Sequence, residues 1–116
     1  MAKHFVARVD EIPPGQRRLV KVAGRTIGVF HVAGGFYAIK NSCIHEGAPV
    51  CLGSITGTFL PSDPQEYRFG MQGRVLRCPW HGWEFDITTG GSIFDPDVKL
   101  KTYPVTVEGD ALFVEL

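Results

Sequence analysis

The chain has 116 residues, of which 44% are hydrophobic and 21% are charged, and its 12 Lys and Arg balance 12 Asp and Glu. This composition is typical of one globular domain and excludes a disordered chain. Because the chain holds neither a basic stripe nor an apolar run of about 20 residues, we expect no nucleic acid and no membrane among its partners.

The N-terminal part predicts a succession of short β-strands. Charges at Lys3 and Arg8 interrupt its beginning, so we expect no signal peptide, and three cysteines are an odd number for a secreted disulfide framework. We therefore expect a cytoplasmic protein. β-Branched and aromatic residues, separated by turns that contain Gly or Pro, predict strands at residues 5–9, 19–22, 26–32 and 36–39.

The C-terminal part repeats this pattern. Residues 102–107 and 111–115 predict a hairpin around Gly109, and Pro104 within the first strand indicates a sheet edge or a bulge. No long segment shows the apolar spacing of an amphipathic helix. The sequence therefore predicts an all-β fold, a small sandwich or barrel, in which residues 1–116 form a single domain.

The middle of the chain is rich in Gly and Pro and carries two Cys/His pairs. Cys43 and His45 form the first pair, and Cys78 and His81 form the second. Each pair offers a thiolate and an imidazole from one short loop. Two Cys ligands on one iron and two His ligands on the other form the ligand set of a Rieske [2Fe–2S] cluster, which would clamp the two loops together.

Two other interpretations of these four residues remain. Two Cys and two His also form tetrahedral zinc sites, although the usual zinc spacing pairs Cys with Cys and His with His. Buried free cysteines and structural histidines are common as well, but two mixed pairs at these spacings make that interpretation less favoured.

The segments CIHEGAP at residues 43–49 and CPWHGWEFD at residues 78–86 resemble the two cluster loops of the Rieske family. The similarity is greatest to ferredoxins and N-terminal domains of bacterial ring-hydroxylating oxygenases, and with the flanking hairpins it covers nearly the whole chain. It implies one Rieske-type [2Fe–2S] cluster and a β-sandwich base into which a loop-rich cluster-binding subdomain, about residues 43–97, is inserted. The implied ligands are Cys43, His45, Cys78 and His81.

Two further regions of the middle segment follow from the resemblance. It implies that a third, proline-containing loop at residues 92–96 shields the cluster. The interval of 32 residues between His45 and Cys78 is longer than usual in the family, because of extra residues at about 56–73. These residues are either a surface excursion, which costs little loop entropy, or a partner-docking element.

The residues around the motifs bear on the reduction potential. High-potential Rieske proteins of respiratory chains resemble this chain, but they join the two loops by a disulfide and place Ser and Tyr hydroxyls at the cluster. The matching residues here are Ala48, Trp80, Trp83 and Phe85. The resemblance thus implies no such disulfide, fewer hydrogen bonds and a potential in the lower part of the Rieske range. Cys51, His4 and His31 are interpreted as structural.

The resemblance and the size favour a one-electron carrier. It would pass electrons from a flavoprotein reductase to a Rieske-type terminal oxygenase, and each partner would dock transiently near the cluster. An oxygenase in its own right is rejected. Its mononuclear iron needs two His and a carboxylate, but the remaining His4 and His31 lie in short strands of the base and are not placed as such a triad. The chain also leaves no room for a catalytic domain. The small subunit of a nitrite-reductase-type enzyme and a redox-sensing iron–sulfur protein remain as alternatives.

Overall fold

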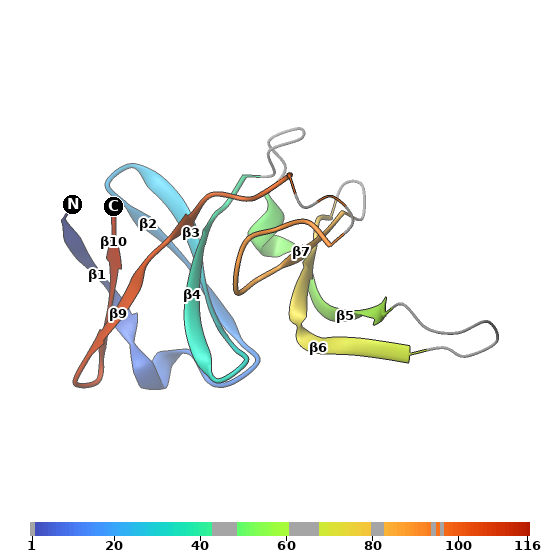
Figure 1. Ribbon diagram of the computed structural model, residues 1–116. Coiled ribbons are helices and arrows are strands. Elements are labelled where there is room, and N and C mark those ends of the chain that lie inside the picture. Colours follow the sequence, from blue (N-terminus) through green and yellow to red (C-terminus); the bar gives the residue numbers. More distant parts are fainter. Residues whose placement is uncertain (1, 43–48, 61–67, 80–82, 94, 96) are drawn as a thin grey trace.

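The computed structural model describes residues 2–42, 49–60, 68–79, 83–93, 95 and 97–116, which form three antiparallel sheets (Figure 1). The first sheet has the order β1 (Lys3–Arg8), β10 (Ala111–Glu115), β9 (Val105–Glu108). The second has the order β2 (Arg17–Val22), β3 (Arg25–Val32), β4 (Gly35–Lys40), β8 (Thr102–Tyr103). The third has the order β5 (Ser54–Leu60), β6 (Arg68–Arg77), β7 (Glu84–Asp86).

Helical structure among the described residues is limited to two short 3₁₀ turns, η1 (Val9–Glu11) and η2 (Val50–Leu52). No helix in this part of the chain is long and apolar enough to cross a membrane. The prediction of an all-β fold is confirmed.

Strands β2, β3 and β4 form a meander with two tight turns. The register pairs Val22 with Arg25 and Val32 with Gly35, so each turn has a two-residue loop. Both loops have the sequence Ala-Gly, and both of their residues have positive φ, with 50° at Ala23 and 51° at Ala33. This is the backbone geometry that two-residue hairpins favour, because its twist matches that of the flanking strands. The meander delivers the chain to the end of β4, three residues before Cys43.

The predicted C-terminal strand is divided by Pro104, which corrects the expectation of one continuous strand. Tyr103 pairs with Ala38 of β4 in the second sheet, whereas Val105 pairs with Val114 of β10 in the first sheet. Pro104 has no N–H to donate to either ladder, although its carbonyl oxygen accepts a hydrogen bond from the Glu115 N–H of β10 at 3.0 Å. The chain therefore changes sheets at a residue that has no main-chain donor to leave unpaired. The passage from β8 to β9 through Pro104 thus joins the first and second sheets, which are together called the base.

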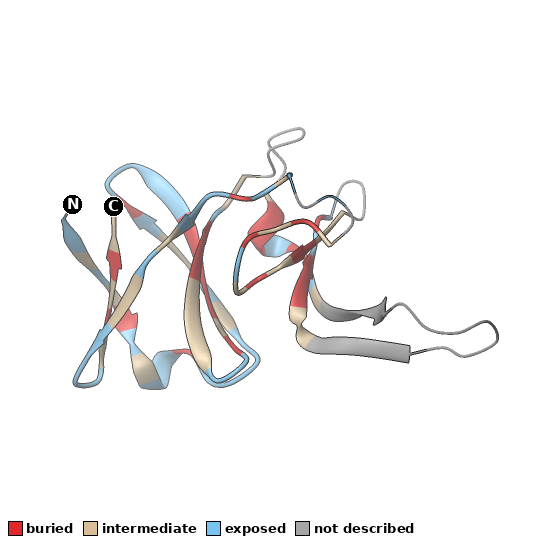
Figure 2. Cartoon of the chain, in the orientation of Figure 1, coloured by how far each residue is buried: buried red, intermediate tan, exposed pale blue. Residues whose placement is uncertain are grey.

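Two hydrophobic cores hold these sheets together. Figure 2 shows buried positions both in the strands of the base and in those of the third sheet. The base core lies within the base and includes Ile27, Val29, Leu112 and Val114. The bridging core joins β3 and β4 to η2 and the third sheet, and includes Phe30, Ile39, Val50, Cys51, Leu76, Cys78 and Phe85. Because base residues contribute to the bridging core, the third sheet is packed onto the base rather than merely tethered to it.

Strands β5 and β6 form a hairpin that contains the extra residues at about 56–73. Its inner part pairs Ser54 with Arg77, and the register shifts between Thr56 and Thr58. β7 pairs with β6 only at residues 75–77, so among the described strands the outer part of β6 pairs with β5 alone. Figure 1 shows this outer part extending away from the base. The described part of the insertion is therefore a two-stranded arm.

Candidate metal centre

Of the four predicted ligands, the structure describes Cys78, whereas Cys43, His45 and His81 lie outside the described residues. The Cys78 side chain is buried, and its backbone N–H donates to Trp83 O at 2.8 Å. This bond closes residues 79–82, here called the second loop, at its base. Cys78 follows β6 directly and β7 begins at Glu84, so the second Cys/His pair lies in the β6–β7 turn.

The other Cys/His pair lies in residues 42–49, here called the first loop, which connects β4 to η2. Asn41 precedes this loop, and its Oδ1 accepts a hydrogen bond from the Cys51 N–H at 2.9 Å. The Asn41 N–H in turn donates to Thr26 O of β3 at 2.9 Å. The residues that flank the first loop, Asn41 before it and Cys51 after it, are therefore joined to each other at the base.

The flanks of the two loops are packed in the same hydrophobic core. Val50 and Cys51, which follow the first loop, share the bridging core with Cys78 and Phe85, which flank the second. The structure thus brings together the chain segments next to both Cys/His pairs. A buried thiol among apolar neighbours suits a soft iron–sulfur site and not a Mg²⁺ or Ca²⁺ site, which needs oxygen ligands. The described residues therefore fit a [2Fe–2S] cluster.

The start of the predicted third loop lies beside β7. The Ile93 N–H donates to Glu84 O at 2.9 Å, and the Ser92 N–H donates to Val98 O at 2.8 Å. Phe94 and Pro96 lie outside the described residues. The main chain before Phe94 is held beside β7, and Val98, after Pro96, is bonded to Ser92. The shielding role of this loop stays a prediction.

Trp83 and Phe85, two of the four residues that bear on the potential, stack on each other. Their ring centroids are 6.4 Å apart and their planes meet at 22°. Phe85 is fully buried, and Trp83 is partly buried against the same core. Both side chains belong to the apolar surroundings of Cys78.

The structure supports the structural roles that the sequence assigns to Cys51 and His31. Cys51 is free and fully buried; burial raises the pKa of its thiol to about 12, so it stays protonated. The His31 ring has Nδ1 2.8 Å from Ile12 O and stacks on Phe36 at 4.1 Å between centroids. Sequence reasoning missed Asn41 and Arg17, whose contacts with the Cys51 region depend on long-range packing.

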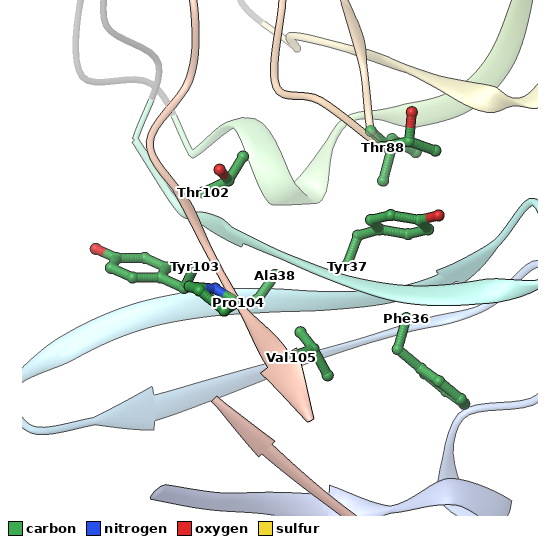
Figure 3. Close-up of a pocket in the computed structure, with 9 residues that line it drawn as sticks. Phe36, Tyr37, Ala38, Thr88, Thr102, Tyr103, Pro104 and Val105 are labelled. Atoms are coloured by element: carbon green, nitrogen blue, oxygen red, sulfur yellow. The ribbon is translucent and has the colours of Figure 1, made fainter. Parts of the chain in front are cut away.

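A pocket of about 390 Å³ lies elsewhere, between β4, β8 and the turn that follows β7 (Figure 3). Tyr37 and Thr88 face it from opposite elements, and Pro104 lies at its rim. None of the residues that line it is a Cys, His or carboxylate, so this pocket offers no ligand for iron.

Comparison with known proteins identifies the family of the chain. The Rieske [2Fe-2S] domain family matches residues 2–104. The ferredoxin component of the naphthalene 1,2-dioxygenase/salicylate 5-hydroxylase systems from Ralstonia sp is 34% identical over 111 residues, which cover 95% of this chain and 91% of that protein. The solved complex of reduced oxygenase and oxidized ferredoxin in carbazole 1,9a-dioxygenase contains a chain with a TM-score of 0.74 and 26% identity, covering 97% of this chain and 91% of that one.

A nitrite-reductase relative shares the fold as well. A chain assigned as the NADH-dependent nitrite reductase small subunit from Mycobacterium tuberculosis has a TM-score of 0.72 and 20% identity, with coverage of 97% and 93%. At this identity the likeness extends to the fold only, whereas the ferredoxin components are similar in sequence over almost their whole length. The chain belongs to the Rieske [2Fe-2S] domain family, and it is a ferredoxin-type electron carrier with one Rieske-type [2Fe–2S] cluster.

Proposed function

We propose that this ferredoxin takes single electrons from a flavoprotein reductase and passes them to a Rieske-type terminal oxygenase. The 34% identity to a dioxygenase ferredoxin component over 95% of the chain supports the pathway. The solved complex of a related ferredoxin with its oxygenase supports direct docking of the two proteins. The reductase is inferred from the need of a carrier for a one-electron donor.

The proposed ligands are Cys43 and Cys78 on one iron and His45 and His81 on the other. The observation that carries this assignment is the shared bridging core, in which the segments flanking both loops are packed together. When bound, the cluster supplies reversible one-electron transfer. The two loops would hold it, and the buried Phe85 with the partly buried Trp83 would exclude water from the apolar surroundings of Cys78.

Transient docking is proposed at the surface formed by described residues that flank the two loops. Leu52 follows Cys51 directly and is 61% exposed, the highest value among the large apolar side chains of the described residues, and Pro79 next to Cys78 is also exposed. Apolar residues near an electron-transfer centre favour a small, short-lived interface. Such an interface keeps the electron path short and lets the partners exchange.

We also propose that residues 43–97 form a cluster-binding subdomain of the single domain 1–116 and that the protein works in the cytoplasm. The described part of that range packs through the bridging core onto β3 and β4 of the base. A reducing compartment suits Cys51 and Cys78, which are free and buried in the described structure.

The ligand assignment is tested by iron and labile-sulfide analysis combined with electron paramagnetic resonance (EPR). Wild-type protein should contain two irons and two sulfides, and Cys78→Ala or His81→Ala should abolish the native cluster. Cys51→Ser is the matched control and should retain it, because that thiol is fully buried and its Sγ lies 3.4 Å from Ile39 O of β4. Zinc without visible absorption, or loss of the cluster in Cys51→Ser, would contradict the assignment.

The pathway is tested by rapid mixing of the reduced protein with purified acceptors. A naphthalene-dioxygenase-type oxygenase should oxidise it rapidly, whereas a nitrite reductase large subunit should not. Fast oxidation by the nitrite reductase alone would favour the alternative that shares this fold.

A further inference from the structure

Residues 50–53, here called the return segment, follow the first loop and are tied to the base by their main chain. The Cys51 N–H donates to Asn41 Oδ1 at 2.9 Å, and Cys51 O accepts from Arg17 Nη1 at 3.0 Å. Arg17 Nη1 also donates to Gly53 O. Because Arg17 lies on β2 and Asn41 directly follows β4, two strands of the second sheet hold this short segment.

Arg17 bonds differently from three other arginines of the described structure. Arg8, Arg18 and Arg74 each pair with a carboxylate, at 3.3, 2.9 and 3.0 Å respectively. Arg17 instead donates to two main-chain carbonyl oxygens, and its guanidinium carbon lies 5.9 Å from the centroid of the Phe30 ring. An arginine held over an aromatic ring and bonded to two carbonyls fixes a backbone conformation.

Asn41 and Cys51 join the two ends of the first loop. Asn41 is fixed by its N–H, which donates to Thr26 O, and its side chain accepts from the Cys51 N–H. The Cys51 thiol reaches into the base, where Sγ lies 3.4 Å from Ile39 O. It occupies the space left by Gly28, since a Cβ at that position would lie 2.6 Å from Sγ. The return segment is therefore held by its side chain as well as its main chain.

The return segment also touches the strand that leads to the second loop. A Cβ at Gly53 would lie only 1.8 Å from Arg77 O, so the two backbones are in direct contact. Arg77 immediately precedes Cys78, and Cys78 shares the bridging core with Val50. A shift of the return segment would displace the backbone next to Cys78, because this contact leaves no free space.

We propose that Arg17 and Asn41 are positioning residues for the cluster. They fix the return segment on the base and so set the spacing of the two loops before the cluster binds. This inference rests on the proposed ligand set. Residues that hold metal ligands in place restrict the site to one geometry, so loss of either contact would loosen the cluster and broaden the range of its ligand geometries.

The test compares Arg17→Met and Asn41→Ala with matched controls. Arg18→Met changes the next residue of β2, which is exposed and pairs with Glu11, and Asn41→Asp keeps an oxygen that accepts the Cys51 N–H. Cluster loss to an iron chelator should be about 10-fold faster in the two test variants. This is the lower end of the affinity cost of losing a residue bonded to a metal ligand, because Arg17 and Asn41 act through the return segment. Their EPR signals should broaden and their potentials should shift, while Arg18→Met behaves as wild type in every readout. Asn41→Asp should keep the wild-type EPR signal and rate of cluster loss, and only its potential should fall, because it adds a negative charge near the cluster.

The readouts separate positioning from general stability. Far-UV circular dichroism reports the β-fold, and if Arg17→Met loses it, Arg17→Lys replaces it, because lysine keeps the charge without the planar fork. A lower unfolding midpoint with an unchanged EPR signal and potential would overturn the inference. So would test variants that match Arg18→Met in every readout. Wild-type protein that binds no [2Fe–2S] cluster would overturn the proposed function instead.

Discussion

Phe85 is the residue whose side chain bears most directly on the reduction potential. It is fully buried next to Cys78 in the bridging core, at the position where high-potential Rieske proteins are expected to carry a tyrosine. Reduction adds negative charge to the cluster, so hydrogen-bond donors near it raise the potential. A chain with Phe here should have a potential below about 0 mV, in the lower part of the Rieske range of about −150 to +300 mV.

Phe85→Tyr should raise the potential. A hydrogen bond to a charged group contributes about 1.5–3 kcal/mol, which for one electron corresponds to roughly 60–130 mV. Protein-film voltammetry measures the change. Phe113→Tyr is the matched control, because Phe113 lies on β10 and packs against Phe5, in the first sheet. A wild-type potential above about +150 mV would contradict the argument, since it lies in the upper part of the Rieske range.

At the scale of elements, an ion pair joins β6 to the end of β7. Arg74 contacts both carboxylate oxygens of Asp86, at 3.2 and 3.0 Å, and the Thr88 hydroxyl and N–H both donate to Asp86 Oδ1, at 2.7 and 2.9 Å. Burial raises the pKa of Asp86, but the hydrogen bonds from Arg74 and Thr88 outweigh it, so the pKa lies below its ordinary value. The ionised carboxylate therefore stabilises the folded state.

Asp86→Asn should destabilise the protein in a pH-dependent way. Because the folded-state pKa is lowered, the stabilisation is complete above the ordinary value of 3.8 and disappears as the pH falls through the folded-state value. Near pH 7 the free energy of unfolding should fall by about 1 kcal/mol, a modest figure because the Arg74 side chain is 41% exposed. Urea unfolding should show the difference shrinking below about pH 4. A constant difference across pH would refute this, and Asp10→Asn in an exposed pair should have no effect.

The β5–β6 arm is expected to be dispensable for cluster binding. Replacing residues 58–70 by Asn-Gly would join Gly57 to Met71 and keep the inner pairs, from Ser54 with Arg77 to Thr56 with Val75. Because β7 pairs with β6 only at residues 75–77, the second loop should stay in place. Iron and sulfide contents should equal those of the wild type, and loss of the cluster would show that the arm supports the site. The rate of electron transfer to the oxygenase then separates the two interpretations of the arm. Removing a docking element would slow the transfer, whereas removing a surface excursion would leave the rate unchanged.

At the scale of the whole molecule, the two cores should respond differently to cavities. Leu112 is fully buried in the base core, and Leu76 is fully buried in the bridging core with Cys78. Replacing either by Ala should lower the free energy of unfolding by about 2–5 kcal/mol. Only Leu76→Ala should also change the EPR signal and the potential, because its cavity adjoins the site. Equal spectral changes in both variants would mean that the two cores are not separate.

Local patterns predicted the strands of the base, but they missed β5, β6 and β7, which lie in the range that the sequence predicts as loop-rich. They also did not predict how the strands are shared among sheets. The β-branched runs and Ala-Gly turns define β2, β3 and β4, because two-residue turns have strong local preferences. The change of sheet at Pro104 was not predicted. Proline only removes a ladder hydrogen bond, and which sheets lie on either side depends on the packing of β4 and β10.

The sequence by itself determined the family, because the Cys/His pairs at 43/45 and 78/81 need only short-range spacing to specify iron–sulfur chemistry. It also determined the all-β class through residue preferences along each strand. Only the tertiary structure decided which residues hold the return segment. Arg17 and Cys51 are 34 positions apart, and their hydrogen bond exists because β2 and η2 meet beside the bridging core. No local pattern encodes such a contact, since it depends on how the third sheet packs onto the base.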